Sequence, residues 1–315
     1  MDKAGSMIDF DGQVVVVTGA GRGLGRLYAL DFARRGACVI VNDLGGTVQG
    51  EGSDQGVASQ VVAEIEQAGG MALASHESVA SPEGGAAIVR AAVDRFGRLD
   101  AVVSNAGIFG TVPFAELPHD DWRRMLNVHL DGGFYLSQPA FRVMRAQGYG
   151  RFVFIASSAG LFGQPEAAHY AAAKAGITGL ANVIALEGAA HGILANTVLP
   201  FGYSRMVSST VGGRELFAEE AAFFDAIDPG LVVPMVTFLA SRACQLTRHS
   251  YSACAGRYAR AFAGLGEGWL AEPGTGPAAE DVAAHLAEIS ATEPFTVPGS
   301  IYDEVAGICT RLGII

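Results

Sequence analysis

The sequence predicts an α/β fold in which a doubly wound parallel sheet of the Rossmann type lies between two layers of helices. Strand-like and helix-like segments alternate along the 315 residues, half of which are hydrophobic. The strand-like segments are nearly all apolar, as expected where both faces of a strand are buried. A glycine-rich turn follows the first of them. We expect one large domain, residues 1–256, with a C-terminal extension, residues 257–315, that packs on the core or on a neighbouring subunit.

The alternation also gives the order of the elements. The expected strands are residues 13–18, 38–42, 71–75, 99–104, 151–155, 193–198 and 250–254. The expected helices are residues 24–35, 54–68, 82–96, 121–146, 170–190 and 229–241, with a short amphipathic helix at 280–289 in the extension. Ligands of such a sheet bind beyond the carboxyl ends of its strands. Gly19, Asp43, Asn105 and Ser157 all fall there.

The glycine-rich turn, residues 19–25, reads GAGRGLG and joins the first strand to the first helix. Glycine permits the tight turn and the close approach of backbone to a pyrophosphate, and the helix N-terminus adds N–H donors. No Lys-Ser or Lys-Thr pair follows, so the turn is not a P-loop for ATP. A tight turn without a ligand is the alternative.

Asp43 ends the second strand, about twenty residues past the glycines, where an acidic side chain can bind the hydroxyls of an adenosine ribose. A carboxylate there repels a 2′-phosphate and so favours NAD over NADP. Arg22 is the opposing signal, because a basic residue in this turn could meet a 2′-phosphate. An ordinary turn residue before Gly45 is the alternative role for Asp43.

Tyr170 and Lys174 stand four residues apart in YAAAK and therefore share one face of the expected helix. The chain has only two lysines, Lys3 and Lys174, against nineteen arginines. An ammonium near a phenol lowers the pKa of the phenol from about 10 and makes it usable as an acid or base. A surface pair without chemistry is the alternative. His169 adjoins Tyr170 but points elsewhere on the helix, and we assign it no catalytic role.

With these motifs the chain resembles the short-chain dehydrogenase/reductase family from about residue 10 to residue 256. The cofactor turn, the segment Ser104-Asn105-Ala106-Gly107 and the segment Ser157-Ser158-Ala159-Gly160 occur in the family's order. The resemblance implies the catalytic residues Asn127, Ser157, Tyr170 and Lys174. It implies the cofactor-binding residues Gly19, Gly21, Arg22, Gly23, Leu24, Gly25, Asp43, Ser78, Val79, Asn105, Ala106, Gly107, Tyr170, Lys174, Pro200 and Gly202. Phe201 interrupts the family's Pro-Gly segment, and Ser204 stands near its usual Thr.

Within the family the chain most resembles the (3R)-hydroxyacyl-CoA dehydrogenase region of the peroxisomal multifunctional β-oxidation enzyme, also called a 17β-hydroxysteroid dehydrogenase. Residues 41–46 (VNDLGG), 77–79, 179–182, 185–188 and 204–206 carry this resemblance. It implies NAD(H)-dependent interconversion of a secondary alcohol and a ketone, on a 3-hydroxyacyl-CoA or hydroxysteroid substrate. An NADPH-dependent 3-oxoacyl carrier-protein reductase and a non-catalytic NAD-binding redox sensor are the alternatives.

The family mechanism gives each catalytic residue a role. Tyr170 takes the hydroxyl proton of the substrate during oxidation, and Ser157 hydrogen-bonds the substrate oxygen. Lys174 lowers the pKa of Tyr170 and holds the nicotinamide ribose, and Asn127 carries a water that links Lys174 to solvent. Residues 204–228, with Phe217, form either a flap over the substrate or an ordinary helix on the core.

Composition and charge exclude other classes of function. The formal net charge of −11 argues against nucleic-acid binding. No signal peptide is recognisable, and no apolar run reaches the ~18–20 residues of a membrane span. Cys38, Cys244, Cys254 and Cys309 lack the spacing of a disulfide framework or a metal site. We therefore expect a cytoplasmic protein that uses no metal.

The resemblance also implies an oligomer. The segments 121–146 and 170–190 are rich in small and apolar residues, and in the family the corresponding helices pair across a two-fold axis, which predicts a homodimer or homotetramer. The extension is expected to add contacts to that assembly or to line the substrate mouth of a neighbour. Contact of Arg257 and Arg260 with the anionic groups of coenzyme A is the alternative.

Overall fold

The computed structural model describes residues 7–203 and 218–314. The chain divides between Arg260 and Ala261 into two compact units. Among the described residues, no helix combines the length and the apolar character that a bilayer span requires.

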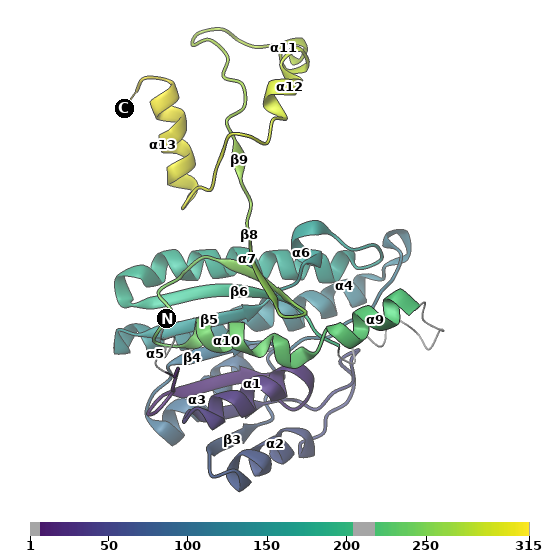
Figure 1. Ribbon diagram of the computed structural model, residues 1–315, viewed down its shortest axis with the longest axis vertical. Helices are drawn as coiled ribbons and strands as arrows, with labels where there is room; N and C mark the ends of the chain where they lie inside the picture. The colour runs from purple at the N-terminus through teal and green to yellow at the C-terminus, as the bar shows by residue number, and fades with distance from the viewer. Residues whose placement is uncertain (1–6, 204–217, 315) are drawn as a thin grey trace, which may run out of the picture. The chain divides into compact units, whose positions relative to one another are not determined.

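The N-terminal unit is built on one eight-stranded sheet in the order β3-β2-β1-β4-β5-β6-β7-β8 (Figure 1). Strands β1 to β7 pair in parallel, as predicted, and the order reverses between β1 and β4. The strands are β1 Val14–Thr18, β2 Cys38–Asn42, β3 Met71–Ser75, β4 Ala101–Ser104, β5 Gly150–Ile155, β6 Ile193–Phe201, β7 Ser250–Cys254 and β8 Arg257–Ala261. A reversal of this kind leaves a crevice at the carboxyl ends of the strands, which is where a ligand binds.

Helices cover both faces of the sheet, and the pattern of strand β1 shows why. Its side chains alternate, so that Val15 and Val17 enter one apolar core and Val14 and Val16 enter the other. The first core is covered by helices α1 (Gly23–Arg34), α2 (Gly56–Gln67) and α10 (Val233–Ala240); the second by α3 (Pro82–Phe96), α5 (Gly132–Gln147) and α7 (Ala168–Gly188). The predicted three-layer, doubly wound fold is confirmed, with element ends shifted by a few residues.

The helix predicted over 121–146 has three parts. Helix α4 (His119–Leu126) passes into a π-helical turn, η2 (Asn127–Asp131), and then into α5. A π turn widens the helix locally and occurs often at functional sites. It lies at the end of the cavity described below.

Several short elements complete the N-terminal unit. They are η1 (Phe114–Glu116), α6 (Ala159–Phe162), η3 (Ala189–His191), α9 (Ala218–Ala226) and η4 (Pro229–Leu231). Strand β8 is an addition to the predicted sheet. Ala255 and Gly256 both have positive φ, 49° and 77°, as a tight two-residue hairpin turn requires. Gly256, the expected end of the first domain, therefore lies inside a hairpin between β7 and β8.

The C-terminal unit has little core of its own. Strand β9 (Leu265–Gly266) pairs antiparallel with β10 (Phe295–Thr296), and the helices are α11 (Ala279–Ala284), α12 (Leu286–Ile289) and α13 (Ile301–Arg311). The helix expected at 280–289 divides at His285, whose ring stacks on Trp269 at 4.1 Å between centroids. None of the described residues 261–314 is buried, and Ile301 on α13 is 70% exposed.

Candidate active site

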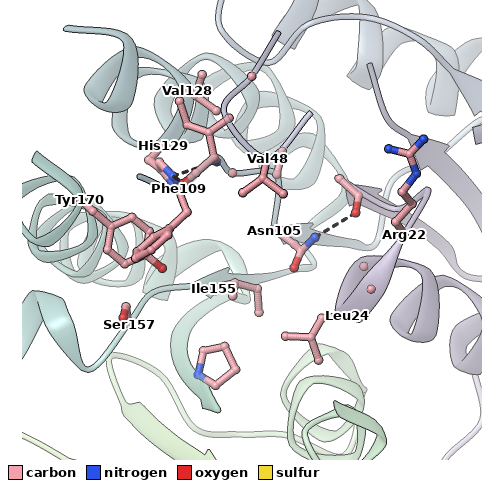
Figure 2. Close-up of a pocket in the computed structure, with 18 of the residues that line it drawn as sticks. Arg22, Leu24, Val48, Asn105, Phe109, Val128, His129, Ile155, Ser157 and Tyr170 are labelled. Carbon is pink, nitrogen blue, oxygen red and sulfur yellow. Dashed lines mark hydrogen bonds between the residues drawn. The ribbon is translucent and has the colours of Figure 1, made fainter. Parts of the chain in front are cut away.

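A cavity of about 480 Å³ opens at the carboxyl ends of strands β1, β2, β4, β5 and β6 (Figure 2). Most of the residues predicted for the site line it. These are Gly19, Arg22, Gly23, Leu24, Gly25, Asp43, Ser78, Val79, Asn105, Ala106, Gly107, Ser157, Tyr170, Lys174, Pro200 and Gly202. Gly21 and Asn127 are not among the lining residues. The structure thus brings together side chains that are far apart in the sequence.

The glycine turn is shaped by close backbone contacts. A Cβ atom on Gly25 would lie 2.1 Å from the carbonyl oxygen of Gly19, and one on Gly19 would lie 2.8 Å from the Cα atom of Ala106. A Cβ on Gly21 would lie 2.2 Å from Val57, so this glycine serves the packing of the turn. Only a glycine-rich turn can pass this closely over the sheet end, and its exposed backbone suits a pyrophosphate.

Asn105 fastens the glycine turn to strand β4. Its side-chain amide donates to the carbonyl oxygens of Thr18 at 2.9 Å and Gly19 at 3.1 Å. The Thr18 hydroxyl in turn accepts from the backbone N–H groups of Asn105 at 3.0 Å and Ala106 at 3.1 Å. Thr18 was not predicted as a site residue. A threonine at the end of the first strand was the available signal.

Asp43 is held at the lip of the cavity by two backbone donors. Its Oδ2 atom accepts from the Gly21 N–H at 2.8 Å, and its Oδ1 atom accepts from the Gly45 N–H at 2.7 Å. Each carboxylate oxygen keeps a further lone pair, which a ribose hydroxyl could use. Arg22 also lines the cavity, and its guanidinium donates to the carbonyl oxygen of Gly46 at 3.4 Å.

Asn42, buried beside Asp43, was missed by the sequence analysis. Its amide donates to the carbonyl oxygens of Glu77 at 2.9 Å and Ser75 at 3.3 Å. It thereby fixes the end of strand β3, which leads to Ser78 and Val79. A polar residue at the end of an apolar strand was the only signal for it.

Two rings pack edge-on against the ring of Tyr170 at the other end of the cavity. Phe109 lies 5.1 Å from it between centroids at an interplanar angle of 84°, and His129 lies 5.3 Å from it at 88° (Figure 2). Edge-to-face contacts of this kind are attractive and directional. Tyr170 is therefore held by its neighbours as well as by helix α7.

Lys174 is buried, and its Nζ atom donates to the carbonyl oxygen of Ile155 at 2.6 Å. The same atom lies 5.6 Å from the centroid of the Tyr170 ring. Burial lowers the pKa of Lys174 to about 7. Burial also raises the pKa of Tyr170, and the Ser157 hydroxyl opposes this rise only in part.

The expectation that Lys174 lowers the pKa of Tyr170 stays a prediction, because burial has the largest effect on the phenol and raises its pKa overall. The pair lies in an apolar setting that disfavours the charged form of both groups. The ammonium is also directed to a backbone carbonyl, because the lysine reaches past Tyr170 to the end of strand β5. The four-residue spacing predicted the shared helix face, but not the degree of burial or the rotamer.

Ser157 follows strand β5, and its hydroxyl accepts from the Ala159 N–H at 3.1 Å, at the start of helix α6. Asn127 opens the π turn, and its neighbours Val128 and His129 line the cavity. Ser157, Tyr170 and Lys174 thus line one end of the cavity, and Asn127 is not among its lining residues.

Several lining residues were not predicted for the site. Val48, Ile108 and Phe109 lie on loops, His129 lies on the π turn, and Ile155 and Phe201 end strands β5 and β6. Phe223 and Phe224 come from helix α9, in the second half of the expected flap. Ser204, Arg205, Met206 and Phe217 lie outside the described residues. Within the described part of the chain, no three His, Cys, Asp or Glu side chains group as ligands of one metal ion.

The comparisons with known proteins agree on one family. The short chain dehydrogenase family matches residues 13–211. The peroxisomal multifunctional enzyme type 2 of Mus musculus is 45% identical over 240 residues, which cover 76% of this chain and 31% of the mouse protein. The structure of the full-length peroxisomal multifunctional enzyme type 2 from Drosophila melanogaster gives a TM-score of 0.79 at 31% identity, covering 97% of this chain and 50% of that chain.

A 7α-hydroxysteroid dehydrogenase complexed with NADH and 7-oxo glycochenodeoxycholic acid gives a TM-score of 0.69 at 27% identity, covering 79% of this chain and 95% of that one. This chain spans about a third to a half of the multifunctional enzymes. The family match covers more than half of the chain and includes the glycine turn, Ser157, Tyr170 and Lys174. The protein therefore belongs to the short-chain dehydrogenase family.

Proposed function

We propose that the protein uses NAD to interconvert a secondary alcohol and a ketone, on a 3-hydroxyacyl-CoA or a hydroxysteroid substrate. One observation carries the proposal. Ser157, Tyr170 and Lys174 line the same cavity as the glycine turn and Asp43. The cavity therefore offers a dinucleotide site at one end and acid-base groups at the other.

The choice of NAD rests on Asp43. Two backbone N–H groups fix its carboxylate beside the glycine turn, where a negative charge repels a 2′-phosphate. Arg22 donates to the Gly46 carbonyl. The bound nicotinamide ring would supply the hydride chemistry. The glycine turn, Asp43, Ser78 and Val79 would hold the cofactor, together with Asn105, Ala106, Gly107, Pro200 and Gly202.

The chain's own residues would handle the proton and the substrate oxygen. Tyr170 takes the hydroxyl proton of the alcohol during oxidation and returns it during reduction. Ser157, whose hydroxyl lowers the pKa of Tyr170, donates to the substrate oxygen and stabilises its developing charge. Lys174 holds the nicotinamide ribose and supplies positive charge beside the phenol, with Asn127 holding a water between Lys174 and solvent.

An acyl-chain or steroid substrate is supported by five apolar side chains that line the cavity. They are Phe109, Phe201, Phe223, Phe224 and Ile227. An acyl chain or a steroid ring system would bury apolar surface there. The hydroxysteroid dehydrogenase solved with 7-oxo glycochenodeoxycholic acid supports the steroid class.

The test is a substrate profile with NAD, followed by the absorbance of reduced nicotinamide. The panel holds (3R)- and (3S)-3-hydroxyacyl-CoA thioesters, hydroxysteroids and short secondary alcohols. We expect the highest kcat/KM for a thioester or a steroid. A highest kcat/KM for a short alcohol, or no turnover of any substrate, would overturn the proposal. A carrier-protein reductase is disfavoured by Asp43, and a redox sensor by the complete catalytic set.

The proposed assembly is a homodimer or homotetramer in the cytoplasm. Helix α13 exposes an apolar face that includes Ile301, Val305 and Ile308, which are 70%, 49% and 47% exposed. A unit without buried residues gains stability by covering such a face. We propose that a neighbouring subunit or the chain's own core covers it. The cysteines of the described chain are free, which suits a reducing compartment.

A further inference from the structure

His129 is a buried imidazole beside the catalytic cluster to which the proposed mechanism gives no role. It lies on the π turn η2, is 4% exposed and lines the cavity. Figure 2 shows its ring beside Phe109 and Tyr170. A buried polar side chain at this place needs a physical reason.

The Nε2 atom of His129 lies within hydrogen-bond distance of two backbone atoms of Ile108. It lies 2.8 Å from the Ile108 carbonyl oxygen and 3.1 Å from the Ile108 nitrogen. One ring nitrogen either donates or accepts, so the shorter contact assigns the proton to Nε2, which donates to the carbonyl. The Nδ1 atom is buried and has no hydrogen-bond partner among the described residues.

The segment to which His129 is hydrogen-bonded contacts Tyr170 through Phe109. A Cβ atom on Gly107 would lie 2.3 Å from the Cε1 atom of His129, so the imidazole fills the space under this segment. Phe109, next after Ile108, packs edge-on against Tyr170, and so does the His129 ring itself. His129 therefore contacts the phenol ring directly and also holds the residue that contacts it from another side.

We propose that His129 is a positioning residue, which as a neutral imidazole fixes the ring of Tyr170 and the segment from Gly107 to Phe109 for proton transfer. The inference rests on the proposed acid-base role of Tyr170. The imidazole contributes in two separable ways. Its ring packs against Tyr170, and its Nε2–H group holds Ile108.

The groups around the imidazole agree with a neutral ring. Burial lowers the pKa of His129 well below its usual range, and the charge of Lys174 lowers it further. His169 adds a smaller effect in the same direction, while the hydrogen bond with Ile108 opposes it. A cationic ring here would carry charge in an apolar place next to a lysine.

The test separates the ring from its hydrogen bond. His129→Ala removes both, His129→Phe keeps a ring, and His129→Gln keeps a donor for the Ile108 carbonyl. The measurements are kcat and KM with NAD and (3R)-3-hydroxyoctanoyl-CoA, NADH affinity by fluorescence, and the Tyr170 titration by NMR of protein labelled at tyrosine Cζ. Tyr170→Phe identifies the Tyr170 signal.

We expect His129→Ala to lower kcat by about 10- to 100-fold, since small misplacements of a catalytic group cost this much, with NADH affinity retained. Water in the vacated space should move the pKa of Tyr170 down towards its ordinary value. His129→Phe should restore most of kcat and the wild-type titration, although its melting temperature falls. His129→Gln should keep the melting temperature but not kcat.

His169→Phe is the matched control, because His169 is also buried, 2% exposed, and precedes Tyr170 without being one of the cavity-lining residues. It should lower the melting temperature and leave the Tyr170 titration unchanged. The inference is overturned if His129→Ala keeps wild-type kcat and titration, or if the Phe and Ala variants are equally impaired. Failure of the proposed function would be distinguishable from failure of this inference. The wild-type enzyme would then oxidise no substrate of the panel, while the Tyr170 titration could still be measured.

Discussion

The Nζ atom of Lys174 donates a 2.6 Å hydrogen bond to the carbonyl oxygen of Ile155, the last residue of strand β5. This bond places a lysine inside the apolar end of the cavity and beside Tyr170. It satisfies one of the three donors of the ammonium group. The burial that comes with it lowers the pKa of Lys174 to about 7.

Lys174 should make the stability of the protein depend on pH. Its pKa in the folded chain lies below the ordinary lysine value of 10.5. Between about 7 and that value the unfolded chain binds more protons than the folded chain, so the free energy of unfolding should rise with pH. Lys174→Met should remove this rise. Chemical denaturation of both proteins across the window measures it, and parallel pH curves would contradict the burial of the ammonium.

Lys174→Arg tests the shape of the lysine site. The planar guanidinium carries its donors in a fixed fork and cannot reproduce the compact ammonium beside Ile155 and Tyr170. We expect low turnover in this variant even though its positive charge is retained. Wild-type kcat in Lys174→Arg would show that charge alone is sufficient, and NADH affinity serves as the control for folding.

Asp43 should set the choice of cofactor. Loss of a hydrogen bond to a charged group costs about 1.5–3 kcal/mol, so Asp43→Ser should weaken NAD by about 10- to 100-fold and improve NADP relative to it. Asp43→Asn is the matched control, because it removes the charge and keeps the shape. Titration of each protein with NADH and NADPH gives the affinities. A wild-type preference for NADPH would mean that Arg22 outweighs Asp43.

The C-terminal unit should matter for assembly. Deleting residues 272–315 should reduce solubility, oligomer size or substrate affinity, because an exposed apolar face needs a cover. Val305→Glu places a charge on helix α13 and should act in the same direction in the full-length chain. Glu304→Gln on the same helix is the control. Light-scattering mass, melting temperature and KM that all stay unchanged would show that the unit is dispensable.

The sheet, and the edge of it at which the cavity opens, could be predicted because both depend on patterns that are local in the sequence. The β-branched run before residue 19 gives a doubly buried strand, and the glycines after it give the turn. Parallel strands then bring Asp43, Asn105 and Ser157 to one edge, whatever the details of the loops. Four-residue spacing sufficed to place Tyr170 beside Lys174.

The remaining features depend on side-chain directions and on loops from distant segments. The reach of Lys174 to Ile155 and the packing of Phe109 on Tyr170 follow from the assembled site. The π turn that brings His129 into the cavity has no marker in the helical periodicity of the sequence. Strand β8 follows a hairpin turn with Ala255 at positive φ, a position that usually takes Asn or Gly.

The most direct measurement of the central claim is the rate of NADH formation by Tyr170→Phe. The substitution keeps the ring between Phe109 and His129 and removes only the hydroxyl that exchanges the proton. We expect kcat to fall by at least ~10²-fold, with NADH affinity and melting temperature close to those of the wild type. Near-normal turnover by Tyr170→Phe would contradict the proposed role of Tyr170 as the catalytic acid and base.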